Sequence, residues 1–156
     1  MKILKTIGWV LLIALVIAQF FGPDKNEGDV SSLDAFLAET NPPEEVKVTL
    51  KSACFDCHSD VTRYPWYNTI TPVNYWLDGH IRDGKKHFNV SDWDKYSLKK
   101  KDHKLDELIE EVEEKHMPLD SYTWTHGDAK LTDAQITAMI GWAKGVRAGY
   151  APQLSE

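Results

Sequence analysis

Cys54-Phe55-Asp56-Cys57-His58 is the stretch on which the organisation of this 156-residue chain depends. It contains the only two cysteines, and a histidine directly follows the second one. On a helical turn, residues three apart lie on one face, so both sulfurs can reach one flat ring while the next imidazole turns toward a metal at its centre. The pattern C-x-x-C-H is typical of c-type haem attachment. We therefore expect thioether bonds from Cys54 and Cys57 and an iron bond from His58.

Three other interpretations of the motif stay open. A thioredoxin-like redox pair also uses C-x-x-C, but it needs a βαβ setting, and nothing strand-like precedes Cys54. A structural zinc site would need one more ligand, for which five other histidines are present, although no second Cys or His pair has zinc-ligand spacing. A plain disulfide would leave His58 unexplained. Haem attachment accounts for all three side chains.

The first 22 residues predict a membrane-anchor helix or a signal peptide. Lys2 and Lys5 precede an apolar run, residues 7–21, that is long for a signal-peptide core and short for a span of about 20 residues. No clear small-x-small cleavage site precedes Gly22, which favours an uncleaved anchor. Basic residues before the run and acidic ones after it predict a cytoplasmic amino terminus and an exported body.

We divide the chain into the anchor or signal peptide (1–22), a tether (23–31), one domain (32–150) and a tail (151–156). Removing residues 1–23 takes two of the 18 basic residues and none of the 24 acidic ones, so the body has a formal net charge of −8. Nucleic acid is not an expected partner for a body of that charge. About 125 residues is the size of a single domain.

Hydrophobic periodicity of the helical kind predicts an all-α domain, and no alternating strand pattern of any length competes. The helix that follows Pro43 delivers Cys54 to the site. Ser91-Asp92-Trp93 begins another helical pattern, which three lysines at 99–101 interrupt, and Thr132-Asp133-Ala134-Gln135 forms a capping box that opens the last helix. The helices are expected at about 33–37, 43–54, 72–82 with an end near Gly84, 105–114, and from 133 onward.

An iron held by His58 has a further coordination position on its other face. We expect Met117 there, because it lies in a loop just before a proline, where the chain can arch over a flat ring. A methionine is typical of an electron carrier with a raised potential, whereas an open position is typical of a small-molecule site. The remaining candidates are the histidines His80, His116 and His126.

Four further side chains are candidates for contact with the cofactor. Trp66 and Trp76 would keep water from the iron, although ordinary packing also uses large aromatic rings. Arg63 is a propionate partner by charge. His126 follows an aromatic loop and would donate a hydrogen bond to a propionate or a carbonyl.

Two long segments, CFDCHSDVTRYPWYNTITPVNYWLDGHIRDGKKHFNVSDW at 54–93 and HMPLDSYTWTHGDAKLTDAQITAMIGWAKG at 116–145, resemble the small haem-binding domain family of bacterial c-type cytochromes. Members of that family commonly begin with a membrane anchor that leads into a stretch such as Pro23-Asp24-Lys25-Asn26. The resemblance extends over nearly the whole chain, and the spacing from C-x-x-C-H through Y-P-W-Y to M-P is more specific than the motif alone.

This resemblance implies one haem c bound through Cys54 and Cys57, with His58 as the proximal iron ligand and Met117 as the distal one. It also implies a cytochrome c-like helical fold, in which the final helix around Trp142 packs against the helix before the motif. Some relatives are associated with cytochrome c peroxidases, but a single C-x-x-C-H does not make a two-haem peroxidase. The resemblance also implies a bacterial inner-membrane protein whose domain faces the periplasm, or an exported protein if the N-terminal segment is cleaved.

The expected function is therefore that of a membrane-anchored periplasmic monohaem c-type cytochrome, which is not an enzyme and passes single electrons between redox partner proteins. One alternative is a five-coordinate or labile-ligand haem sensor that binds small molecules. Another is a structural haem subunit of an oxidase or peroxidase complex. The acidic helix face at 106–114 either steers a basic partner or is simply solvated.

Overall fold

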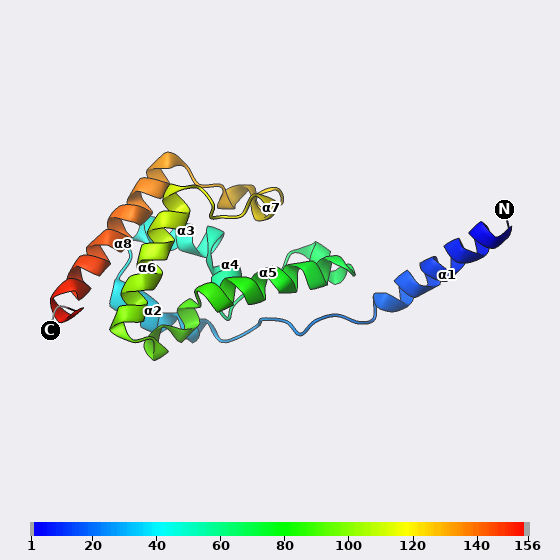
Figure 1. Ribbon diagram of the computed structural model, residues 1–156, viewed down its shortest axis with the longest axis horizontal. Coiled ribbons are helices and arrows are strands. Elements are labelled where there is room, and N and C mark those ends of the chain that lie inside the picture. The colour runs from blue at the N-terminus through cyan, green and yellow to red at the C-terminus, as the bar shows by residue number, and fades with distance from the viewer. Residues whose placement is uncertain (1, 155–156) are drawn as a thin grey trace.

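The computed structural model describes residues 2–154, and the fold is helical (Figure 1). Within these residues no strand is present, and Glu27 and Val61 form an isolated antiparallel bridge. The expectation of an all-α domain is confirmed. The helices are α1 (Lys2–Ala18), α2 (Asp34–Thr40), α3 (Glu44–Ala53), α4 (Phe55–His58), α5 (Val73–His87), α6 (Leu98–Glu113), α7 (Asp120–Thr123) and α8 (Asp133–Leu154), with 3-10 turns η1 (Val30–Leu33), η2 (Trp66–Thr69), η3 (Val90–Lys95) and η4 (Gly127–Ala129).

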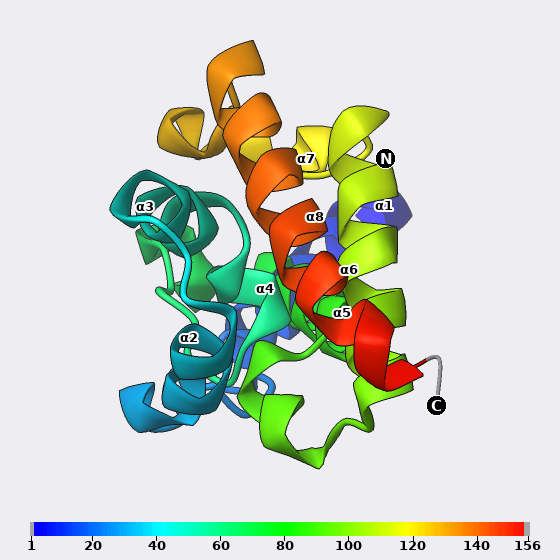
Figure 2. The ribbon, with the colours of Figure 1, turned by 90° about the vertical axis from the view of Figure 1, so that its left-hand side faces the viewer.

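Helices α6 and α8 lie side by side and form the most extensive helix pair of the domain (Figures 1 and 2). Arg147 on α8 links them, because its Nε donates to Asp102 Oδ1 of α6 at 2.8 Å and its Nη1 also bonds Asp106. Helix α8 also packs against α3, as the sequence resemblance implies. This framework holds the C-terminal end of α3, where the C-x-x-C-H motif begins.

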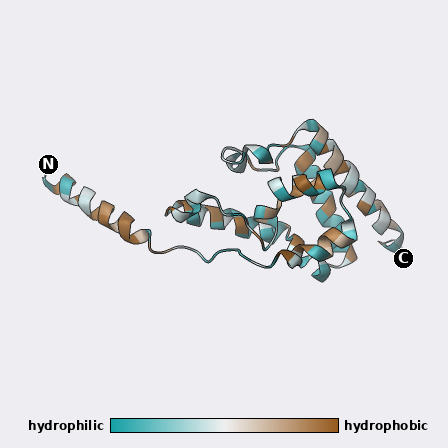
Figure 3. Ribbon diagram, turned by 180° about the vertical axis from the view of Figure 1, so that it is seen from behind, coloured by the Kyte–Doolittle hydropathy of each residue, from teal (hydrophilic) through white to brown (hydrophobic). Residues whose placement is uncertain are grey.

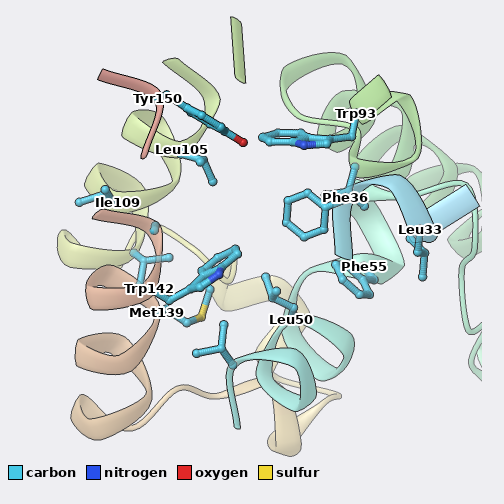
Figure 4. Close-up of a cluster of buried hydrophobic side chains, with 14 residues drawn as sticks. Leu33, Phe36, Leu50, Phe55, Trp93, Leu105, Ile109, Met139, Trp142 and Tyr150 are labelled. Carbon is cyan, nitrogen blue, oxygen red and sulfur yellow. The ribbon is translucent and has the colours of Figure 1, made fainter. Parts of the chain in front are cut away.

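The core is built around Phe36 of α2 (Figure 4). Its ring makes edge contacts with Trp93 at 5.0 Å and Trp142 at 6.0 Å between centroids, and with Phe55 of the motif at 6.3 Å. Trp142 also donates its Nε1–H to the carbonyl of Thr40 at 2.9 Å. Each large apolar side chain buried here contributes about 1.5–3 kcal/mol. Phe55 therefore fixes one face of α4 to the core and leaves its other face for the site.

Helix α1 corrects the expectation of a membrane anchor. It stands away from the body at the end of an extended segment (Figure 1), and its C-terminal half is largely apolar (Figure 3). Its 17 residues span only about 25 Å, less than the roughly 30 Å of a bilayer core. Among residues 2–154, no helix is long and apolar enough to cross a membrane. The predicted anchor helix, and with it the predicted inner-membrane localisation facing the periplasm, was therefore wrong.

The polar residue that follows α1 connects this helix to the body. The Gln19 side chain donates to the carbonyl of Thr71 at 3.1 Å and accepts from the Thr71 N–H at 2.9 Å. This pair ties the end of α1 to the turn that precedes α5.

Two other helix limits differ from the sequence expectation. Helix α6 begins at Leu98 and runs through the three lysines, because Ser97 caps it and Lys101 forms an ion pair with Glu39. Helix α8 continues through most of the expected tail to Leu154, whereas residues 155 and 156 lie outside the described part.

Candidate functional site

The C-x-x-C-H motif lies at the junction of α3 and α4. The Cys54 N–H donates to the carbonyl of Leu50 at 2.9 Å and so ends α3, as the sequence predicted for the helix that delivers the motif. The four residues after it form α4, a single turn. Because one turn points successive side chains in different directions, each residue of the motif faces a different neighbour.

Both thiols of the motif are free and half-buried. Burial raises the pKa of Cys54 to about 12 and that of Cys57 to about 11, so both are protonated at neutral pH. The structure therefore contains two uncharged thiols three residues apart rather than a disulfide.

His58 is held by one hydrogen bond that fixes its tautomer. Its Nδ1 lies 2.9 Å from the carbonyl oxygen of Phe88, and because a carbonyl only accepts, Nδ1 carries the proton. Burial lowers the pKa of His58 despite its hydrogen bonds to the backbone of Phe88 and Gly84, which favours the neutral ring. The lone pair of Nε2 is then available to a metal, in the arrangement usual for metal-binding histidines.

Gly84 sets how closely α5 approaches the motif. A Cβ at this position would lie 2.6 Å from the carbonyl oxygen of Cys57 and 3.1 Å from its Cβ. The sequence predicted a helix end near this glycine, but α5 continues to His87. Gly84 is therefore required for backbone contact between two helices.

A cleft runs from Cys57 outward between α5 and the segment that carries α7, with α4 at its inner end. Figure 1 shows how these three helices are arranged. Its cavity volume is about 40 Å³, so most of the space between its walls is open to solvent. Four residues singled out from the sequence meet there with Cys57: Arg63, Trp76, His80 and His126. Apolar side chains, including Leu77, Ile81 and Leu119, line the rest.

Asp56, between the two cysteines, is a buried carboxylate with partners on both oxygens. Its Oδ1 accepts from the backbone N–H and the Nε of Arg63, both at 3.0 Å. Its Oδ2 accepts from Arg63 Nη2 at 2.9 Å and from the Tyr122 hydroxyl at 2.7 Å. The hydrogen bond to Asp56 raises the pKa of Arg63, and burial, followed by the same carboxylate, raises the pKa of Tyr122. Arg63 and Tyr122 therefore keep their protons and donate to Asp56.

The two cleft histidines are both oriented by nearby backbone. The His126 ring stacks on Tyr122, with centroids 4.1 Å apart, and its Nδ1 lies 3.1 Å from the Tyr122 carbonyl. The His80 Nδ1 lies 2.9 Å from the carbonyl of Trp76, and the two rings are 4.4 Å apart. In both rings Nδ1 contacts the backbone, and Nε2 is the nitrogen that takes no part in this contact.

Other residues predicted for the site lie outside the cleft wall. Within the described chain, the lining includes neither Cys54 nor His58, and Met117 is half-buried after α6, where its N–H donates to Glu111 at 3.0 Å. Trp66 is 77% exposed and lines a second, shallower opening that shares Arg63 and His126 with the cleft. His116 is exposed and lies 3.3 Å from the carboxylate of Glu114. The structure thus brings Arg63, Trp76, His80 and His126 together in the wall of the cleft, whereas Met117 lies outside it.

The alternative interpretations of the motif find no support in this geometry. Among residues 2–154, no group of three or more His, Cys, Asp or Glu side chains is placed to hold a metal ion, as a structural zinc site requires. No βαβ unit surrounds the cysteines within the same residues.

Asn26 is a supporting residue that sequence reasoning did not identify. Its side-chain amide donates to the carbonyl of Ser59 at 2.8 Å and to Thr62 at 2.9 Å, and its Oδ1 accepts from Lys85 at 2.7 Å. Its backbone N–H donates to the Tyr64 hydroxyl at 2.7 Å. The segment expected to be a tether thus holds the loop after the motif against α5, and the Pro23-Asp24-Lys25-Asn26 stretch was the only signal of it.

The chain matches one family of known proteins over most of its length. A family model described as a haem-binding domain matches residues 13–145, which include the motif and every residue of the cleft. No curated protein and no solved structure matches the chain.

Proposed function

The chain belongs to the haem-binding domain family, and we propose that it is a monohaem c-type cytochrome that carries single electrons between redox partner proteins. The observation that supports this most strongly is the motif itself. Two free thiols stand three residues apart, and the adjoining imidazole already uses Nδ1 on the Phe88 carbonyl. These donors fit a haem, because they offer two bonds to its edge and one neutral nitrogen to its iron.

In this proposal Cys54 and Cys57 hold the haem through thioether bonds, and His58 Nε2 binds the iron. When bound, the haem supplies one-electron chemistry between ferric and ferrous iron. Arg63 is the partner for a propionate, since Asp56 holds its guanidinium at the cleft wall. The apolar side chains of the cleft exclude water, and this exclusion shifts the redox potential of the iron.

Covalent attachment is tested by whether the haem survives denaturation. The purified protein is expected to keep its haem on a denaturing gel, and Cys54→Ser together with Cys57→Ser is expected to lose it. His58→Ala should keep the covalent haem but change its visible spectrum, whereas His103→Ala, an exposed histidine paired with Glu107, should change neither. Extraction of all haem from the wild-type protein by acidified solvent would exclude a haem c.

We infer that Met117 is the sixth ligand, delivered by the loop in which it stands. The ferric protein is then expected to show the red-region charge-transfer band of methionine-bound iron, and Met117→Ala is expected to abolish it. Met139→Leu is the control, because Met139 is fully buried in the core and the change conserves volume. A band that persists in Met117→Ala would assign the position to another methionine.

A second candidate function is a small-molecule site with an open or labile position. It is favoured by the cleft, whose wall contains His80 and His126 but not Met117. Carbon monoxide separates the two functions: rapid binding to the ferrous protein at neutral pH indicates an open site, and slow binding indicates a carrier with both positions filled.

A further inference from the structure

The shallow opening lined by Trp66 has a wall that is largely aromatic. Trp66 and Tyr67 make an edge contact with ring centroids 5.8 Å apart, and Tyr67 makes another with His126 at 6.3 Å. Trp66 is 77% exposed, so its ring meets water rather than the core. The opening has a volume of about 300 Å³ and is open to solvent, so a side chain can enter it from outside. Tryptophan is among the residue types most enriched at the energetic centres of protein interfaces.

One carboxylate in the wall of this opening has no partner. Asp128 is exposed, and within residues 2–154 its side chain forms no hydrogen bond or ion pair. The other acidic residue and the arginine of the wall neutralise each other, because Arg63 Nη2 lies 2.9 Å from Asp56 Oδ2. Among the acidic residues, lysines and arginines of the opening, Asp128 is therefore the uncompensated charge.

An exposed indole beside an unpaired carboxylate suits the side chain of a lysine or arginine. The face of an indole ring attracts a cation, and the carboxylate forms a charge-assisted hydrogen bond with it. Anionic surfaces are disfavoured, because Asp128 and the body, with its formal net charge of −8, repel them. Charge complementarity therefore indicates a basic protein as the occupant.

The opening also lies next to the C-x-x-C-H motif. Asp56, which stands between Cys54 and Cys57, forms part of its wall, and the Asp56 side chain is only 8% exposed. A partner seated in the opening would thus stand close to the two residues that hold the haem in the proposed function.

We propose that Trp66 and Asp128 form the docking surface for a basic redox partner, whose lysine or arginine side chain lies against the Trp66 ring and pairs with the Asp128 carboxylate. The inference rests on the proposed function, which supplies the electron that the partner exchanges. Such a contact is small, as is usual for transient electron-transfer encounters.

The test is a titration of the haem-loaded, ferrous protein, labelled with nitrogen-15, with a hexaarginine peptide at low salt. Nuclear magnetic resonance separates the indole N–H signals of the six tryptophans. The Trp66 signal should shift, whereas that of Trp93, which is fully buried, should not. Trp66→Ala and Asp128→Asn should each weaken binding of the peptide at this opening roughly 2- to 5-fold, followed through the backbone N–H signal of Tyr67.

Two exposed residues outside the opening provide matched controls. Trp124→Ala removes a tryptophan that is 80% exposed, and Asp94→Asn removes an exposed carboxylate of η3, so neither should change the affinity. Equal affinity of the wild type, Trp66→Ala and Asp128→Asn would overturn the proposal. Shifts confined to residues 106–114 would overturn it too, because the peptide would then bind the acidic face of α6.

Electron transfer provides a second readout. Oxidation of the ferrous protein by the cation tris(phenanthroline)cobalt(III), followed by stopped flow, should slow in Trp66→Ala and Asp128→Asn, whereas oxidation by the anion ferricyanide should not. Unchanged rates with the cation would overturn the redox role of this surface. Failure of the proposed function looks different, because the wild-type protein would then lose its haem on a denaturing gel while its Trp66 signal still responds to the peptide.

Discussion

Substitution of Gly84 by alanine should destabilise the protein, although alanine is the better helix former. In the interior of α5 the exchange would by itself stabilise the helix by about 1 kcal/mol. The new Cβ would, however, lie 2.6 Å from the carbonyl oxygen and 3.1 Å from the carbonyl carbon of Cys57. Overpacking of this kind costs about 1–3 kcal/mol, and the upper half of that range applies because the obstructing atoms are backbone and cannot rotate away. The net expectation is a loss of about 1–2 kcal/mol.

The same helix provides the control. A Cβ added at Gly79 would meet no neighbouring atom within 4 Å, so Gly79→Ala should gain about 1 kcal/mol. The free energy of unfolding of both variants is measured by urea denaturation followed by circular dichroism, and the two should differ by about 2–3 kcal/mol. Gly84→Ala should also reduce the haem bound per protein, because the clash displaces the backbone of Cys57. Equal stability of the two variants would refute the argument that α5 needs a glycine against the motif.

Three further changes test the packing that supports the site. Trp142→Phe leaves the carbonyl of Thr40 without its donor and should lower the free energy of unfolding in urea by about 1–3 kcal/mol; an unchanged value would show that water replaces the indole. Burial alone would raise the pKa of Glu39, but hydrogen bonding, first from Lys101, outweighs it and lowers the pKa below 4.5. A carboxylate with a lowered pKa stabilises the fold above its unfolded pKa, so Glu39→Gln should be less stable than the wild type at pH 7, and thermal melts should show this difference shrinking as the pH falls below 4.5; a constant difference would contradict the assignment. Asn26→Ala removes three side-chain hydrogen bonds and should lower the urea midpoint by an amount equivalent to about 2 kcal/mol. An unchanged midpoint would show that residues 23–31 are a free tether.

Interactions between residues close in the chain were predictable. The capping box forms as expected: the Thr132 N–H donates to Gln135 Oε1 at 2.9 Å, and the Gln135 N–H donates to Thr132 Oγ1 at 3.3 Å. Helix α3 ends at the motif for the same reason, since its apolar period and its first-turn acidic residues act within a few turns.

Interactions between residues far apart in the chain were not predictable. The lysines at 99–101 suggest a break in the helix, yet Lys101 lies inside α6, because it pairs with Glu39, 62 residues away, and lies over the Trp93 ring. In the sequence Asp56 is only a spacer between two cysteines, and nothing local indicates its bond to Tyr122, 66 residues away.

Local spacing was enough to predict that two thiols and an imidazole stand together in one helical turn, because their spacing along the chain sets their spacing in space. Hydrophobic periodicity was likewise enough to predict a helical domain. The neighbour of each motif residue follows from the folded domain: Phe55 meets the core, Asp56 meets Tyr122 of α7, Cys57 lines the cleft beside α5, and His58 bonds the carbonyl of Phe88. Packing of the whole core selects these partners, because it brings α5 and α7 to the cleft beside α4, whereas a local pattern specifies only the face of a helix.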